Sequence, residues 1–176
     1  MSQTDLAFAD LLADTKHSAV HLEMRDSYGI GEEATEFKAW LAGWRPSPEP
    51  DTWWNEFHTM VRDAVARGVE FRRARIVSEP VSDYIRYEHS CTYQNIAAGE
   101  SVRWLPRRKA SDLALPGNDY WLFDQQVVMW NHFTGDGESA GPEVDRRETV
   151  AMLCTTAFEA VWNRATPHEE YPIHPA

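Results

Sequence analysis

The stretch Asp51–Val77, DTWWNEFHTMVRDAVARGVEFRRARIV, contains a helix pattern, a glycine stop and a strand pattern in direct succession. Apolar residues recur at three- and four-residue intervals along its first half, which is the spacing of one buried helix face. Asp51 is suited to cap the start of this helix and Gly68 to end it. The β-branched and aromatic residues of Val69–Val77 predict a strand. A helix followed directly by a strand is typical of a parallel α/β unit.

The flanking sequence adds elements of both kinds. Val20 to Met24 alternates apolar and polar residues, as a half-buried strand does. Ser101–Leu105 predicts another short strand, and a tight turn joins the strands Tyr120–Phe123 and Val127–Phe133 as a β-hairpin. Further helices are expected over Leu6–Asp14, over Glu32–Leu41, from Ser78 to the stop at Gly99, and from Asp145 to Pro167.

These patterns predict a single α/β domain over residues 1–167. Helices pack on a mixed central sheet, and the hairpin belongs to the C-terminal half of the domain. The glycine-rich segment Thr134–Val144 is expected to be irregular. Residues 168–176 are expected to form a loose C-terminal tail.

The composition is that of a folded protein, with 43% apolar and 26% charged residues in 176. Its apolar runs are shorter than the ~20 residues that span a bilayer, and its first residues lack the basic and apolar regions of a secretory signal. The two cysteines, Cys91 and Cys154, are too few for a disulfide scaffold. We therefore expect a cytoplasmic protein without membrane contact.

The net charge of −11 is unevenly distributed along the chain. Residues 62–109 contain ten Lys and Arg against six Asp and Glu, a local balance of +4. A solvated strand face is the preferred interpretation of this excess, and a contact with one anionic group is the alternative. The strongly acidic remainder argues against direct nucleic-acid binding.

The segment Leu115–Gly137 is the candidate functional site. A Pro-Gly loop leads into the first hairpin strand, and polar residues lie at the strand ends. Antiparallel pairing is expected to bring Asn118 or Asp119 near Asn131 and His132. Carboxylate, amide and imidazole groups gathered in this way bind a polar ligand or transfer a proton.

This segment also has a purely structural interpretation. Asp119 and Asp124 favour turns for backbone reasons, and His132 is then a strand-end histidine with its own partner. The alternatives remain open on the sequence alone. Additional candidate ligand contacts are Arg86 and His89 on one helix face, Arg107 in the loop before the hairpin, and Asp136 in the turn after it.

No metal site or cofactor is predicted. His17 and His21 have the i, i+4 spacing of a zinc pair, but the motif glutamate is missing and the pattern there turns to strand. The sequence lacks the Gly-x-Ser-x-Gly elbow, the phosphate-binding Gly-Lys-Ser/Thr loop and the Gly-x-Gly-x-x-Gly turn. Common serine hydrolases, P-loop NTPases and Rossmann enzymes are therefore unsupported.

Three segments resemble an actinobacterial family of uncharacterised domains. They are Arg73–Glu88 (RARIVSEPVSDYIRYE), Val102–Arg107 and Asn131–Phe133, and the resemblance extends from about Leu6 to His168. Members of that family are often encoded beside helix-turn-helix regulators. The resemblance implies a bacterial cytoplasmic protein in regulation or specialised metabolism, without an established activity.

The chain is also similar, more distantly, to one half of the phospholipase D fold. The motif of that superfamily, His-x-Lys-x4-Asp, supplies a nucleophilic histidine and a phosphate-binding lysine. With Asp124 at the motif aspartate, Asp119 occupies the lysine position and Gly117 the histidine position. The resemblance thus implies a degenerate form that has lost the phosphodiesterase chemistry, since Asp119 would repel phosphate.

The first functional hypothesis is a non-catalytic binding or regulatory protein. Its Leu115–Gly137 site would hold a small anionic or polar ligand, or a helix-turn-helix regulator as protein partner. The alternative is a small cytosolic hydrolase or transferase acting on a small polar substrate, with Asp119, Asp124 or His132 as acid-base groups.

Overall fold

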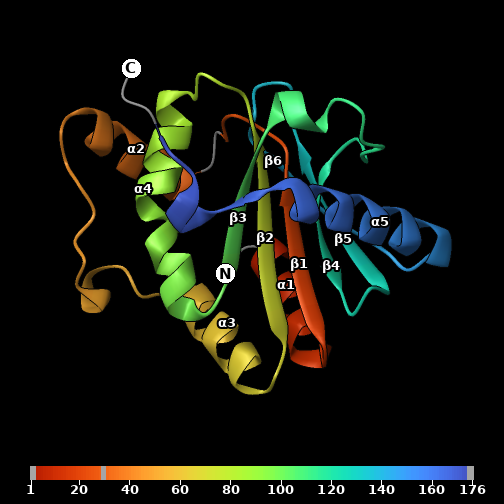
Figure 1. The fold of residues 1–176 in the computed structure, drawn as a ribbon. Helices are drawn as coiled ribbons and strands as arrows, with labels where there is room; N and C mark the ends of the chain where they lie inside the picture. Colours follow the sequence, from red (N-terminus) through yellow and green to blue (C-terminus); the bar gives the residue numbers. More distant parts are fainter. Residues whose placement is uncertain (1–2, 29–30, 174–176) are drawn as a thin grey trace.

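The computed structural model describes residues 3–28 and 31–173. Within these residues, seven strands form one mixed sheet in the order β6-β5-β4-β1-β2-β3-β7 (Figure 1). Strands β1, β2 and β3 are parallel, and the other neighbouring strands pair antiparallel. The predicted α/β fold with a mixed sheet and a hairpin is confirmed. The strands are β1 (Ser18–Glu23), β2 (Glu70–Val77), β3 (Ser101–Pro106), β4 (Asp119–Phe123), β5 (Val127–Phe133), β6 (Ser139–Asp145) and β7 (Thr166–Pro167).

Helices cover both faces of the sheet (Figure 1). Cys154 and Phe158 of α5 belong to a core cluster that includes Leu22 and Ile76 on one face of the sheet. On the other face, α1 and α3 pack against Trp121 and its neighbours. The α-helices are α1 (Gln3–Asp14), α2 (Gly31–Leu41), α3 (Glu56–Ala66), α4 (Asp83–Ala98) and α5 (Glu148–Arg164).

The helix that the sequence predicts to begin at Asp51 begins at Glu56 in the structure. Asp51 lies instead in a short 3-10 turn, η1 (Pro50–Thr52). The Asn55 side chain accepts a hydrogen bond from the His58 backbone N–H, and the His58 ring accepts one from the Asn55 N–H. This reciprocal capping satisfies two donors at the helix start. Gly68, with φ +96°, follows the helix end as predicted.

The segment expected to be irregular contributes an edge strand. β6 pairs antiparallel with β5, and the register is interrupted between His132 and Phe133. Gly141, with φ +96°, lies within β6. Pairing with an existing sheet edge outweighs the low strand propensity of a Gly-Pro sequence.

Residues 168–173, for which the sequence predicts a loose tail, pack against β3. Trp104 Nε1 donates a hydrogen bond to His168 Nδ1 at 3.2 Å, and the ring of Tyr171 stacks on Trp104 at 5.8 Å. Tyr171 is buried, and its hydroxyl donates to Glu79 Oε1 at 2.7 Å. The burial of this aromatic ring explains the order of the segment. Residues 174–176 lie outside the described part.

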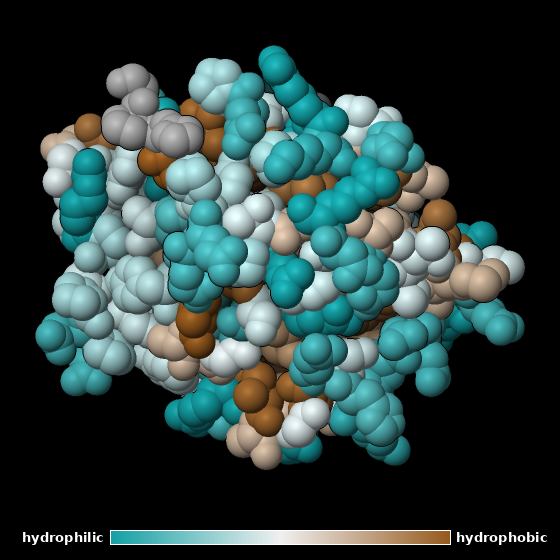
Figure 2. Space-filling view, viewed as in Figure 1, coloured by the Kyte–Doolittle hydropathy of each residue, from teal (hydrophilic) through white to brown (hydrophobic). Residues whose placement is uncertain are grey.

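The surface is predominantly polar. Figure 2 shows one face on which hydrophilic residues predominate and hydrophobic ones are scattered. Trp44 is 44% exposed, whereas Trp40 packs against Tyr87 and Trp53 against Tyr93 on the outside of α4. Across residues 3–28 and 31–173, no helix is both long and apolar enough to cross a membrane.

Candidate functional site

A cavity of about 180 Å³ lies at the carboxyl ends of β1 and β2, next to the start of β4 and the end of β5. We call it the β1–β2 cavity. This end of a parallel strand pair is where open α/β sheets place their binding sites. The lining of the cavity consists of His21, Glu23, Tyr28, Glu33, Arg73, Arg75, Tyr84, Glu88, Asp119, Asn131 and Phe133.

The register of the strands explains why so many polar side chains meet here. His21 pairs with Arg73 across β1 and β2, and two residues further along the strand Glu23 pairs with Arg75. Side chains of directly paired residues point to the same face of a sheet, as do residues two apart in a strand. The two pairs therefore project together into the cavity.

Arg73 and Arg75 are held in a buried network of carboxylates. Arg73 Nε donates to Glu100 Oε2 at 2.8 Å, and Arg73 Nη1 donates to Glu23. Arg75 donates to Glu88, and its Nε lies 2.8 Å from Glu23 Oε2. Although burial opposes the ionisation of Glu23, Arg75 and Arg73 hold its pKa well below the ordinary value. The two guanidinium charges are thus neutralised by the protein itself.

The His21 side chain is buried between Trp121, Asn131 and Glu23. Its ring stacks on Trp121 with centroids 3.9 Å apart, and its Nε2 lies 3.2 Å from Asn131 Nδ2. An amide nitrogen can only donate, so Nε2 accepts and the ring proton of a neutral His21 is on Nδ1. Nδ1 lies 3.2 Å from Glu23 Oε1. Burial lowers the pKa of His21, which favours this neutral form.

Asp119 and Glu33 are the carboxyl groups of the cavity that are not bonded to an arginine. Asp119 accepts hydrogen bonds from the Met24 N–H at 2.9 Å and from the Tyr28 hydroxyl. Burial raises the pKa of Asp119 to about 6. Glu33 accepts a hydrogen bond from the Tyr84 hydroxyl, and burial together with the neighbouring Glu88 raises the pKa of Glu33 to about 9.

Of the cluster predicted from the sequence, the structure joins Asp119 and Asn131 but separates His132 from them. Asp119 and Asn131 are paired directly across β4 and β5. His132 follows Asn131 in the strand, so its side chain points to the other face, where Nε2 lies 3.0 Å from Glu143 Oε2. The imidazole that completes the carboxylate and amide pair is His21.

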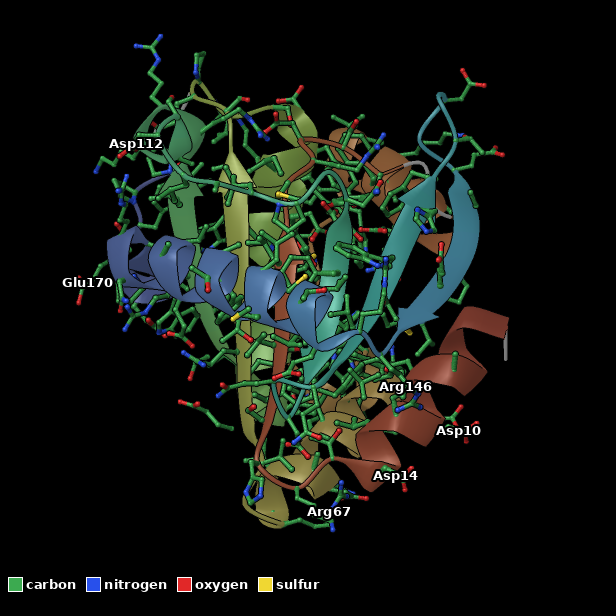
Figure 3. All side chains as sticks on the ribbon, turned by 90° about the vertical axis from the view of Figure 1, so that its right-hand side faces the viewer. Asp10, Asp14, Arg67, Asp112, Arg146 and Glu170 are labelled. Carbon is green, nitrogen blue, oxygen red and sulfur yellow. The ribbon has the colours of Figure 1, made fainter. Side chains whose placement is uncertain are left out.

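Asp124 lies at the opposite end of β4 from the cavity. Its carboxylate accepts hydrogen bonds from the backbone N–H groups of Lys16, His17 and Ser18, at 2.9, 2.7 and 2.9 Å. Although partial burial opposes it, these donors lower the pKa of Asp124. A separate surface pocket at this end is lined by Asp124 and by Arg146, which Figure 3 labels. Asp124 therefore joins the β4–β5 turn to the start of β1.

Four further predicted contacts also lie outside the cavity lining. Asn118 and Asp136 are exposed in the segments flanking the hairpin. On α4, Arg86 is absent from the lining, and His89 packs against the ring of His168 with centroids 4.3 Å apart.

Arg107 has a supporting position behind the cavity. Its Nη2 donates to the backbone carbonyls of Met24 at 2.6 Å and Ile76 at 3.2 Å, and its Nε donates to Ser78 Oγ at 3.0 Å. It therefore ties together the chain segments that leave β1 and β2, rather than presenting a free charge to a ligand.

Sequence reasoning missed most of the cavity. It assigned the basic residues of β2 to a solvated strand face, whereas Arg73 and Arg75 are buried. The available signal was the alternation of charged residues on a strand that directly follows a buried helix. His21 and Glu23 carry the same alternation on β1. Charged residues at matching positions of two expected neighbouring strands indicate a buried ionic layer.

With this geometry established, comparison with protein families gives one match, which extends over residues 6–172. The chain belongs to the family described as a domain of unknown function, DUF6879. A search of curated proteins finds no match. The affiliation therefore supplies no activity for the DUF6879 domain.

Two solved structures relate the DUF6879 domain to phospholipase D. Nuc from Salmonella typhimurium, a phospholipase D family member, has a TM-score of 0.53 at 12% identity, covering 93% of this chain and 89% of Nuc. NucT from Helicobacter pylori has a TM-score of 0.54 at 10% identity, covering 94% and 91%. Such identities show a shared fold only. The phospholipase D-like resemblance of the fold is thereby supported.

A third similar structure corrects an expectation from the sequence. TrmBL2, an archaeal chromatin protein with a novel mode of DNA binding, has a TM-score of 0.50 at 12% identity. The match covers 93% of the DUF6879 chain and half of TrmBL2. The prediction that excluded nucleic acid as a direct partner is wrong, because a similar fold occurs in a DNA-binding protein. Net charge sums over the whole surface, whereas contact with DNA depends on local patches.

Proposed function

We propose that this DUF6879 domain is a non-catalytic binding protein that holds a small polar ligand in the β1–β2 cavity. The observation that supports this most directly is the convergence of ionisable and amide side chains from four strands and two helices on one small hollow. Small-molecule sites are concave and orient their ligand through fixed polar groups, and the small volume and mainly polar lining of this one suit a small polar ligand.

The charge of the lining favours a polar ligand over the anionic one that the sequence also allowed. Glu23 and Glu88 already neutralise Arg73 and Arg75. A bound anion would therefore find no unpaired guanidinium and would lie beside carboxylates, which repel it. Asp119, at the lysine position of the phospholipase D motif, adds to this repulsion.

The same lining is poorly equipped for covalent catalysis. Among its described residues there is no lysine, serine, threonine or cysteine, and the His21 ring is buried, with Nε2 bonded to Asn131 and Nδ1 3.2 Å from Glu23 Oε1. Asp124 and His132, the other acid-base candidates, lie outside the cavity. Asp119 is the remaining candidate, and its pKa of about 6 suits an acid-base role. The enzyme alternative therefore depends on Asp119.

A thermal-shift screen of small sugars, polyols, amines and amino acids tests the proposal. At a concentration 100 times its Kd, a ligand stabilises the native state by about 2.7 kcal/mol, which corresponds to a rise in Tm of about 5–10 °C. We expect Asn131→Ala to abolish the shift and His132→Ala, one position away, to retain it. Loss of the shift in His132→Ala alone would move the site to the outer face of the hairpin. Conversion of the ligand, followed by NMR and abolished in Asp119→Asn, would establish the enzyme alternative.

A further inference from the structure

We propose that the ligand of the β1–β2 cavity is a small organic cation with a primary ammonium group. This inference rests on the proposed binding function and specifies its ligand class. It follows from the hydrogen-bonding capacity of the cavity, from its charge and from its aromatic walls.

The arginine and tyrosine donors of the cavity each have a carboxyl partner within the protein. The guanidinium groups of Arg73 and Arg75 donate to carboxylates. The hydroxyls of Tyr28 and Tyr84 donate to the carboxyl groups of Asp119 and Glu33. A hydroxyl has one proton to donate, so these tyrosines cannot also donate to a ligand. The protein's own carboxyl groups therefore take up much of the donor capacity of the cavity.

Acceptors, in contrast, are in excess. Each carboxylate has about four lone-pair positions, and Glu88 and Asp119 receive between them only a few hydrogen bonds from the protein. The protonated Glu33 accepts a hydrogen bond from Tyr84 and shares one with Glu88. The Asn131 amide, which donates through Nδ2, presents its oxygen as another acceptor. The complementary ligand is a group with several donors and no acceptor, and an ammonium group has three.

The charge of the lining leads to the same ligand class. Four carboxyl groups, those of Glu23, Glu33, Glu88 and Asp119, face two guanidinium groups. With Glu33 protonated and the other three carboxyl groups ionised, the lining has a net charge of −1, from three negative and two positive groups. A single ammonium group reduces this excess, whereas a carboxylate or phosphate increases it.

Aromatic rings provide the remaining wall. Tyr28 lies between Tyr84 and Phe133, with ring centroids 6.0 and 5.2 Å away. The faces of such rings attract cations, and they also shield the methylene groups of an alkylammonium from water. Arg25 already lies over one face of the Phe133 ring, with Cζ 4.8 Å from the centroid, so that face is not available to the ligand.

Binding of a cation should release a proton from the cavity. Glu33 faces Glu88 and Tyr84 of α4 and Arg75 of β2, and its pKa of about 9 keeps it protonated near neutral pH. An ammonium group beside it favours the ionised form, so the proton leaves as the ligand enters. Affinity should therefore increase with pH between about 6 and 8, as long as the amine itself stays protonated.

Isothermal titration with ethanolammonium, ethylene glycol and glycolate tests this inference, because the three probes are similar in size and differ in charge. We expect ethanolammonium alone to bind, with proton release detected as a difference in heat between buffers of unlike ionisation enthalpy. Asp119→Asn and Glu33→Gln should each weaken it by about ten- to hundredfold, the effect of one hydrogen bond to a charged group. Glu36→Gln, on α2 but outside the cavity, is the matched control.

The outcomes separate the two proposals. Preferential binding of ethylene glycol or glycolate that is lost in Asn131→Ala would overturn the proposal of a cationic ligand and leave the proposed binding function in place. Binding of ethanolammonium that is unaffected by Asp119→Asn and Glu33→Gln, both shown to be folded by circular dichroism, would also overturn it. Failure of these probes and of every compound in the thermal-shift screen would overturn both proposals.

Discussion

Replacing Glu23 with glutamine should destabilise the domain strongly. The Glu23 carboxylate lies between Arg73 and Arg75, and the side chains of all three are at most 9% exposed. Glutamine keeps the shape of the side chain and removes its charge. No cavity is created, so the effect reports the loss of the charge together with the loss of one acceptor oxygen, since the glutamine NH2 group cannot accept from an arginine.

The magnitude follows from the cost of an uncompensated buried charge. Removing one partner of a buried ion pair typically costs about 3–5 kcal/mol. Glu100 and Glu88 continue to accept hydrogen bonds from Arg73 and Arg75 in the variant, so the lower end of that range applies. We expect a loss of about 3 kcal/mol in the free energy of unfolding, and a fall in Tm of about 6–12 °C.

Urea unfolding followed by circular dichroism measures this loss. The control is Glu70→Gln. The Glu70 side chain is 64% exposed, and its carboxylate lies 3.3 Å from Arg72. Because this carboxylate is largely exposed and Arg72 keeps Glu159 as a partner, its loss should cost about 0–1 kcal/mol. A loss below about 1 kcal/mol in Glu23→Gln, equal to that of the control, would refute the reasoning that the network requires this carboxylate.

The pH dependence of the two proteins provides a second readout. The pKa of Glu23 is depressed in the folded state, so its contribution is complete above the unfolded value of about 4.3 and is lost as the pH falls below that value. The stability difference between wild type and Glu23→Gln should therefore be constant at neutral pH and shrink on acidification below about pH 4. A difference that persists unchanged there would contradict the assignment to charge.

Two further predictions concern groups outside the cavity. Burial and the nearby His168 lower the pKa of His89 to about 4. The unfolded state therefore binds more protons than the folded state between about pH 6.5 and pH 4, and the stability of the domain should fall as the pH is lowered through that range. Because His89 is partly exposed to solvent, we expect a loss of about 1–2 kcal/mol relative to His89→Gln, measured by urea titration at both pH values, and parallel curves would contradict this. Asp124→Ala removes the acceptor for three backbone N–H groups and should cost about 2 kcal/mol at neutral pH, whereas Asp136→Ala in an exposed turn should cost less than about 0.5 kcal/mol.

Element types could be predicted from the sequence because their signals are local. The helix and strand of Asp51–Val77 follow from apolar spacing and from Gly68, which are properties of neighbouring residues. The helix start was misplaced because Asp51 and Asn55 are both good caps. The choice of Asn55 depends on its bond with His58 and on the fold of the preceding turn.

The candidate site was predicted in part. Placement of Asp119 opposite Asn131 follows from a short hairpin, in which the turn fixes the register. The same two-residue alternation removes His132 from that face, so the pattern itself could have excluded it. The C-terminal segment was expected to be loose because Tyr171 has no periodic partner nearby in the chain, while its actual partner is Trp104 on β3.

What the sequence by itself determined is the α-helices and five of the seven strands, in their order, while β6 and β7 were not predicted. What only the tertiary structure decided is which polar residues share the β1–β2 cavity. His21 meets Asn131 across 110 positions and Glu23 meets Arg73 across 50, because β1 lies between β2 and β4 in the sheet. Strand order is fixed by packing and pairing over the whole domain, and no local pattern encodes it. The burial of these charges, and the ligand proposed from it, therefore follow from the fold.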